Sequence, residues 1–235
     1  MNLILLFDGD FTGADRVRLS GRRLKHVRSV HHAAAGDELV VGRLGGKLGR
    51  GVVTQLDDDA LELQVTLTDD PPPPLPVTLV LALPRPKVLN RVIAAATSLG
   101  VKRIVLINAW RVEKSYWSSP RLSDDNLLLQ RVLGLEQARD TILPSIELHR
   151  LFRPFVENEL PAMARDTLAL VAHPHATRDC PREAGRAVTL VIGPEGGFIA
   201  QELSSLERAG CAAVSLGPRV LRVETAVAAL LARLF

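Results

Sequence analysis

Two glycine-containing segments in the C-terminal half of the chain carry residues whose types and spacing suit chemistry. The first, 191–198, reads Val-Ile-Gly-Pro-Glu-Gly-Gly-Phe, and its glycines let the backbone turn sharply and approach a ligand closely. It has neither the G-x-G-x-x-G spacing of a dinucleotide site nor the G-K-[ST] of a P-loop. A glycine loop of this kind predicts a nucleoside held by backbone groups, although composition alone favours an ordinary strand-to-helix turn.

The second segment, 215–226, reads Ser-Leu-Gly-Pro-Arg-Val-Leu-Arg-Val-Glu-Thr-Ala. Gly217 and Pro218 predict a bend, and Arg222 and Glu224 stand beside the start of an apolar helix. An arginine and a carboxylate at this place could orient a substrate and handle a proton. Composition alone favours the alternative, a surface ion pair with an acid that complements the helix dipole.

The elements that must position these segments follow from the hydropathy pattern after residue 76. Apolar strands are expected at 77–83, 101–107, 168–172, 188–192 and 213–216, and helices at 88–99, 124–139, 201–209 and 224–234. Alternating helices and continuous apolar strands predict a mainly parallel sheet covered on both faces. Both glycine segments follow predicted strands, where open α/β sheets bind their ligands.

The first part of the chain has a different character. Strands at 39–41, 51–56 and 60–67 and one helix at 21–31 predict a small β-rich domain, built as a compact barrel. The prolines that follow Asp69 and Asp70 form a stiff, extended spacer. We therefore divide the chain into a β-rich domain at 1–70, a proline linker at 71–76 and an α/β domain at 77–235.

Composition narrows the class of protein. With 235 residues, 47% of them apolar and 23% charged, the chain reads as globular. Cys180 and Cys211 are too far apart for a C-x-x-C motif and predict reduced thiols of a cytoplasmic protein. No apolar run reaches the roughly 18 residues of a membrane span, so no membrane association is expected. Neither His31-His32 nor His173-x-His175 has the ligand set of a metal site, so no metal is expected.

Positive charge is unevenly distributed along the chain. Residues 16–28 contain six basic residues and no acid, and residues 82–121 contain eight against the single acid Glu113. Clustered lysines and arginines neutralise phosphates, so both stretches together favour RNA or DNA over two merely solvated faces. With only 4% aromatic residues, broad base-stacking platforms are not expected. Trp110, Tyr116 and Trp117 of the second stretch could equally stack on a base or pack beneath a loop.

The two loops together resemble the sequence signature of a known protein family. Ile-Gly-Pro-Glu-Gly-Gly at 192–197, followed by Leu-Gly-Pro-Arg-Val-Leu-Arg-Val-Glu-Thr-Ala at 216–226, resembles the signature of the ribosomal small subunit methyltransferase E family of the SPOUT class. The stretches 87–101, 136–144 and 25–39 resemble further segments of that family. The resemblance covers nearly the whole chain, and the two loops are highly specific as a pair.

The resemblance implies a fold and an activity. It implies an α/β, SPOUT-type parallel sheet with a C-terminal trefoil knot, preceded by a small PUA-like RNA-binding β-barrel domain. It implies a homodimer that binds S-adenosyl-L-methionine in the knot and methylates N3 of one uridine in bacterial 16S ribosomal RNA. The substrate is then small-subunit ribosomal RNA or the assembled small subunit. Another acceptor such as a ribose 2′-hydroxyl, or a non-catalytic RNA-binding ribosome-assembly factor, stays open; a nicotinamide enzyme is disfavoured by the missing G-x-G-x-x-G.

The matched loops also suggest roles for particular residues. Uridine N3 must lose a proton before it attacks, so Glu224 is the candidate base and Arg222 the candidate anion stabiliser. Glu195 is the second candidate base, although its expected role is to shape its loop. The residues expected to bind the cofactor are Ala172, His173, Ile192, Gly193, Glu195, Gly196, Gly197, Leu216, Gly217, Val220, Leu221, Arg222, Thr225 and Ala226. The residues expected to bind RNA are Arg22, Arg23, Lys25, Arg28, Lys87, Arg91 and Arg219.

Overall fold

A computed structural model describes residues 2–235, which form two compact units. The smaller unit holds the chain up to residue 73 together with 132–143, and the larger unit holds 74–131 and 144–235. The change of unit after residue 73 falls among the linker prolines, but the order of the chain did not indicate that 132–143 joins the smaller unit. It does so because Val132 and Leu135 are buried against Leu3 and Leu5.

The larger unit is built on a six-stranded sheet in which every pairing is parallel. Its strand order is β11-β9-β10-β6-β7-β8. The strands are β6 (Val77–Ala82), β7 (Arg103–Ile107), β8 (Ser145–His149), β9 (Leu168–Ala172), β10 (Val188–Ile192) and β11 (Ala212–Val214). All five residues of β10 are buried, as expected for a central strand covered on both faces. The parallel α/β sheet expected from the hydropathy pattern is thus confirmed.

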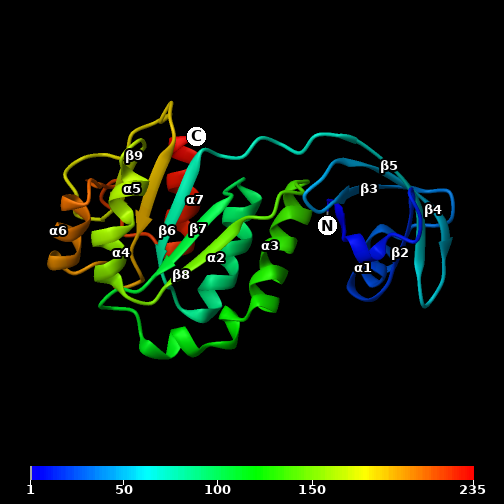
Figure 1. Cartoon of the computed structure of the whole chain (residues 1–235), viewed down its shortest axis with the longest axis horizontal. Coiled ribbons are helices and arrows are strands. Elements are labelled where there is room, and N and C mark those ends of the chain that lie inside the picture. The colour runs from blue at the N-terminus through cyan, green and yellow to red at the C-terminus, as the bar shows by residue number, and fades with distance from the viewer. Residues whose placement is uncertain (1) are drawn as a thin grey trace. The chain divides into compact units, whose positions relative to one another are not determined.

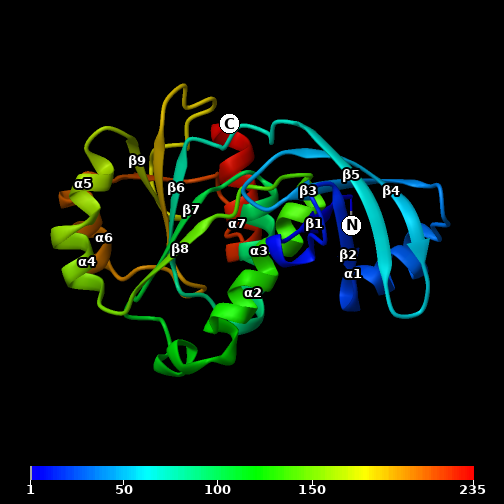
Figure 2. The same ribbon diagram turned by 45° about the vertical axis from the view of Figure 1, so that its right-hand side comes forward.

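Helices cover both faces of this sheet (Figures 1 and 2). One face carries α2 (Pro86–Ser98) and α7 (Val223–Leu234), and the other carries α4 (Phe152–Asn158), α5 (Leu160–Ala164) and α6 (Ala200–Arg208). Leu89, Val92, Ile93 and Ala96 form the buried stripe of α2, at the spacing that predicted this helix. Helix α3 (Asp124–Ala138) begins in the larger unit, and its residues from 132 onward belong to the smaller one.

The predicted elements of the larger unit agree with the structure to within two residues at each end. Strand β8, the α-helices α4 and α5, and two short 3-10 helices at Lys114–Ser118 and Pro120–Leu122 were not predicted. Strand β8 lies at the edge of the sheet and is half-exposed, so it lacks the continuous apolar run of its neighbours. Helices α4 and α5 are too short to show a helical period.

The smaller unit contains one curled sheet, with the strand order β1-β3-β4-β5-β2. The elements are β1 (Ile4–Leu6), β2 (Arg16–Leu19), α1 (Gly21–His26, extended by a π-helical turn to His31), β3 (Glu38–Arg43), β4 (Leu48–Leu56) and β5 (Leu61–Asp69). Among the described residues the two edge strands, β1 and β2, do not pair with each other. The expected compact barrel is therefore corrected to an open half-barrel.

Two further properties of the described residues bear on function. No helix within residues 2–235 has the length and apolar character needed to cross a membrane. Cys180 and Cys211 are both buried free thiols, and burial raises the pKa of Cys211 to about 12.

Candidate functional site

The loops that follow β9, β10 and β11 enclose a cavity of about 500 Å³ at the carboxyl edge of the sheet. We call it the nucleoside cavity. Its walls come from residues 172–175 after β9, 192–197 after β10, and 214–223 after β11, with Ala226 and Leu230 of α7 behind them. The two glycine segments, which lie about twenty residues apart in the sequence, thus meet in one place because their strands lie on either side of β9.

Every residue expected to bind the cofactor lines this cavity, with one exception. Thr225 does not line it, because it is exposed on the outer side of α7 while Val223, Ala226 and Leu230 face inward. Several lining residues were not expected there: Pro174, His175, Pro194, Val214, Ser215, Arg219, Val223 and Leu230. The spacing of four residues between Ala226 and Leu230 was a signal that could have identified Leu230.

The glycine loop 193–197 is held from two directions. On one side the Oε1 atom of Glu195 accepts a hydrogen bond from the backbone N–H of Arg85 at 3.0 Å. On the other side the guanidinium of Arg111 donates to the carbonyl oxygen of Gly196, and a Cβ on Gly196 would lie 2.8 Å from the Cδ of Arg111. Gly197 has a positive φ of 70°, which favours glycine. Glu195 therefore shapes its loop in this structure, and Arg111 is a positioning residue that the sequence did not single out.

A histidine pair forms the wall of the cavity after β9. The backbone N–H of His173 donates to the carbonyl oxygen of Val214 at 2.9 Å, and the rings of His173 and His175 lie 5.8 Å apart. Burial, and secondarily the charge of His175, lowers the pKa of His173 below its ordinary value. His173 therefore presents a neutral imidazole to the cavity at neutral pH.

A second cavity, of about 700 Å³, adjoins the first. We call it the basic recess, because Arg85, Lys87, Arg91 and Arg222 line it. Its remaining walls are Pro86, Val88, Tyr116, Glu195 and Glu224. Arg222 and Glu195 line both cavities, so the nucleoside cavity and the basic recess meet at these two side chains.

The carboxylates of the basic recess already have partners. Glu224 forms an ion pair with Arg91, with 3.0 Å between Oε1 and Nη2. A hydrogen bond from its own backbone N–H, together with Arg91, holds the pKa of Glu224 below its ordinary value, so the carboxylate is ionised at neutral pH. Glu195 is bound to the backbone of Arg85. Four cations against two occupied carboxylates leave the recess net positive, which suits an anionic ligand.

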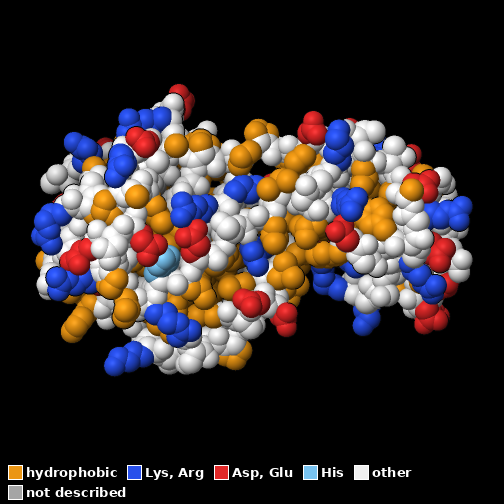
Figure 3. Space-filling view, viewed as in Figure 1, with side chains coloured by type: hydrophobic (Ala, Val, Ile, Leu, Met, Phe, Trp, Pro, Cys, Tyr) orange, Lys and Arg blue, Asp and Glu red, His pale blue; other side chains and the backbone are white. Residues whose placement is uncertain are grey.

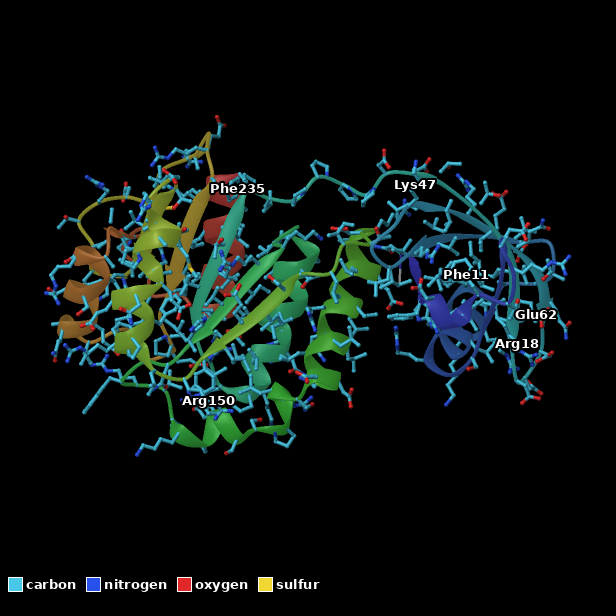
Figure 4. All side chains as sticks on the ribbon, viewed as in Figure 1. Phe11, Arg18, Lys47, Glu62, Arg150 and Phe235 are labelled. Carbon is cyan, nitrogen blue, oxygen red and sulfur yellow. The ribbon has the colours of Figure 1, made fainter. Side chains whose placement is uncertain are left out.

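The arginines expected to bind RNA in the smaller unit are engaged within that unit. Arg22 makes a two-pronged bond to Glu136, at 2.8 and 3.0 Å, and this carboxylate is completely buried. Arg23 bonds to Asp10 at 2.7 Å and to the carbonyl oxygen of Leu5. In the same stretch, Arg28 forms an ion pair with Asp58. Arg18 forms one with Glu62, and both residues are labelled in Figure 4.

The other residues expected to bind RNA lie elsewhere. Lys25 is exposed on α1, Lys87 and Arg91 belong to the basic recess, and Arg219 lines the nucleoside cavity. Lysine and arginine side chains are also spread over the visible face of the larger unit (Figure 3). Within residues 2–235 no group of three or more His, Cys, Asp or Glu side chains is arranged to hold a metal ion.

Comparison with known proteins agrees with this geometry. The family model for the RNA methyltransferase domain matches residues 71–235. Ribosomal RNA small subunit methyltransferase E of Mycobacterium tuberculosis is 32% identical over 226 residues, which are 92% of this chain and 84% of that protein. Ribosomal RNA small subunit methyltransferase E 1 of Borreliella burgdorferi is 23% identical, covering 97% of this chain and 95% of the relative.

A solved structure shares the fold. The ribosomal RNA small subunit methyltransferase E of Neisseria gonorrhoeae, bound to S-adenosyl methionine, superposes with a TM-score of 0.78. It is 21% identical and covers 99% of this chain and 95% of its own. Because the domain model matches most of the chain and the mycobacterial relative is similar across nearly all of it, the chain belongs to the ribosomal RNA small subunit methyltransferase E family of RNA methyltransferases.

Proposed function

We propose that this protein transfers a methyl group from S-adenosyl-L-methionine to N3 of a uridine in bacterial 16S ribosomal RNA. The observation that carries the proposal is the pair of adjoining cavities that share Arg222 and Glu195. One cavity has the size and apolar, glycine-lined wall of a small-molecule site. The other is lined by cations, as a site for a nucleotide of RNA requires.

The nucleoside cavity fits the cofactor. Gly193, Gly196 and Gly197 let the backbone approach the adenosine, and the apolar part of the wall comes from Leu216, Ala226 and their neighbours. The neutral His173 adds no positive charge next to a positively charged ligand. When bound, the cofactor supplies a methyl group already activated by its sulfonium. The Neisseria relative was solved with the same compound bound.

The basic recess supplies a base and a positive charge, both of which uridine N3 needs to become a nucleophile. N3 is a poor nucleophile until its proton leaves, and the negative charge then spreads onto O2 and O4. Glu224 is ionised and takes this proton, and Arg222, at the junction of the two cavities, stabilises the resulting anion. Because its lowered pKa makes Glu224 a weak base, the anion stabilisation by Arg222 carries the larger share of the effect.

The proposal includes the finer features that the family resemblance implies. The half-barrel of the smaller unit is a PUA-like RNA-binding module, the segment after β11 forms part of a trefoil knot, and the active protein is a homodimer. Lys25, Lys87 and Arg91 bind phosphates and set the register of the RNA. The substrate is the small-subunit RNA, either naked or in the assembled subunit, and the protein works without a metal.

The decisive experiment measures methyl transfer to 16S RNA, both free and within small subunits from cells that lack the modification, followed by nucleoside analysis. We expect 3-methyluridine, and a slower turnover by about a hundredfold for Arg222→Ala and tenfold or more for Glu224→Gln. Cofactor affinity, measured by calorimetry, should remain when Glu224 is changed. Near wild-type rates in both variants would refute the assigned roles. A 2′-O-methylated nucleoside would move the acceptor to ribose, and cofactor binding without transfer to any RNA would favour a non-catalytic assembly factor.

A further inference from the structure

The carboxyl edge of the sheet continues beyond the basic recess. Strands β6, β7 and β8 are consecutive neighbours at roughly 5 Å spacing, and all three end at this edge. Arg85 of the recess lies in the loop after β6, and Lys87 lies in the first turn of α2. The loop after β7 carries Trp110 and Arg111, and β8 is followed by Arg150. Figure 1 shows the segment between β7 and α3 along the lower edge of the larger unit, and Figure 4 shows Arg150 there.

The two tryptophans of this edge have different surroundings. Trp117 is buried; its Nε1 donates to the Oδ1 of Asn108 at 2.9 Å, and the guanidinium of Arg150 lies over its ring at 5.4 Å. Trp110 is 78% exposed, the most exposed large hydrophobic residue in the described part of the chain. Trp117 therefore packs beneath the loop, whereas the fold does not use the ring of Trp110.

The backbone that carries Trp110 is held firmly. Its N–H donates to Oε1 of Glu202 at 2.7 Å, and the other oxygen of this largely buried carboxylate accepts the N–H of Ile199 at 3.1 Å. The next residue, Arg111, clamps the glycine loop at Gly196. The exposed ring is thus presented from a fixed position, next to the arginine that holds the wall of the nucleoside cavity at Gly196.

The charge around Trp110 indicates the kind of partner. Arg111, Lys114 and Arg121 lie in the same loop and are exposed, as is Arg150 after the neighbouring strand. The single acid of the loop, Glu113, accepts the hydroxyl of Tyr116. Four cations against Glu113 and the largely buried Glu202 leave this surface net positive. An exposed aromatic ring on a positive surface is the arrangement by which proteins bind single-stranded nucleic acid, with bases stacked on the ring and phosphates on the cations.

We propose that Trp110 stacks on a base next to the target nucleotide in single-stranded RNA, with Arg111 and Arg150 near the adjoining phosphates. This inference rests on the proposed function, which places the target nucleotide in the basic recess after β6. The loop of Trp110 adjoins the recess, since β7 is a direct neighbour of β6 and Tyr116 of this loop lines the recess. A single ring of this kind binds one flanking base, and it needs no broad aromatic platform.

The test compares Trp110→Ala and Trp110→Phe with Leu129→Ala, which shortens an exposed apolar side chain of α3. Binding of a short, fluorescein-labelled single-stranded oligouridine is measured by anisotropy, and the KM for 16S RNA is measured in the methylation assay. We expect Trp110→Ala to raise the Kd for oligouridine and the KM for 16S RNA about fivefold to a hundredfold, as the loss of one base–aromatic stack predicts. Trp110→Phe should raise both values less. The kcat and the cofactor affinity of both Trp110 variants should match the wild type, and so should the RNA affinity and KM of Leu129→Ala.

A second measurement reports on stacking directly. The chain has two tryptophans, so Trp117→Phe leaves Trp110 as the only one, and RNA should quench its fluorescence and shield it from acrylamide. Unchanged RNA binding in Trp110→Ala, or no quenching by RNA, would overturn the inference. A change of oligomeric state in Trp110→Ala would also overturn it, because the ring would then lie between copies of the chain. If the wild type transfers no methyl group but its binding of oligouridine still depends on Trp110, the proposed function fails and the stacking role stands.

Discussion

The loops after β9, β10 and β11 line an open cavity of about 500 Å³, whereas the arginines at 18, 22, 23 and 28 in the smaller unit are paired with carboxylates. Both regions stand out in the sequence, the first by its glycine motifs and the second by its closely spaced basic residues. In the larger unit, glycines and arginines remain available to a ligand. In the smaller unit, much of the positive charge of the stretch stabilises the fold of the unit itself.

The two patterns differ in how strongly they depend on distant parts of the chain. A glycine loop is visible in the local sequence because glycine adopts backbone conformations that other residues rarely do, although Arg85 and Arg111 hold loop 193–197 from distant positions. The availability of a charged side chain depends on whether the fold brings it an opposite charge. Arg22 finds its partner, Glu136, 114 residues further along the chain, and no local pattern announces that pairing.

The largest effect is expected on cofactor affinity, when a side chain is added to the glycine loop 193–197. In Gly196→Val the added side chain would begin 2.8 Å from Arg111, so either the loop or its clamp must move. We expect the loss of measurable cofactor binding by calorimetry, with the fold retained by circular dichroism. Gly9→Val is a suitable control, because no atom lies within 4 Å of a Cβ at that position. Wild-type affinity in Gly196→Val would show that the cofactor binds elsewhere.

The next largest effect tests the structural role of Arg22. Arg22→Ala leaves the buried carboxylate of Glu136 without its partner, so we expect a loss of about 3–5 kcal/mol in the free energy of unfolding, measured in urea. The neighbouring exposed Lys25→Ala should change it by less than about 0.5 kcal/mol. If Arg22→Ala instead keeps its stability and loses RNA affinity, the contrast between the two regions would not hold.

A third effect concerns the pH dependence of the nucleoside cavity. Burial lowers the pKa of His173, so the imidazole is neutral at pH 7 and gains a proton only below its ordinary value of 6.5. We expect cofactor affinity to stay constant from pH 7 to pH 8.5 and to fall below pH 6, by up to about tenfold per pH unit, as a positive ring meets a positive ligand. His173→Gln should flatten that fall. A wild-type profile that is equally flat down to pH 5 would contradict this role.

The smallest effect is expected at the exposed ion pair of the basic stretch. Arg28 and Asp58 are both largely in solvent, so Asp58→Ala should change the free energy of unfolding by less than about 1 kcal/mol. It would, however, release Arg28 for a phosphate. We expect slightly tighter RNA binding and a steeper salt dependence, by about one unit of slope at most. Weaker RNA binding in Asp58→Ala would assign Asp58 a role of its own.

Local patterns predicted the elements that repeat them over enough residues. Strands β9 and β10 agree with their predicted bounds because each is a short, continuous apolar run between polar residues. Strands β1 and β2 have three and four residues, too few to display an alternation, and both lie at edges of their sheet. The half-barrel also depends on which edges pair, a property that no single strand carries.

The same distinction applies to the site. All residues predicted to bind the cofactor except Thr225 line the nucleoside cavity, and Thr225 was assigned by its place in a motif and not by the face of α7. The clamp by Arg111 was not predicted, since it joins residues 85 positions apart. The roles of Trp110 and Trp117 could not be separated until their burial was known.

Local patterns of a few residues were enough to predict the parallel α/β character of the larger unit, the position of its two glycine loops and the family resemblance. They did not predict that the two loops form one cavity, that a basic recess adjoins it at Arg222, or that the arginines of the smaller unit are largely engaged. Each of those outcomes depends on strand order or on a partner that is distant in the chain. Contacts of that kind are created by packing, and they leave no mark in local spacing.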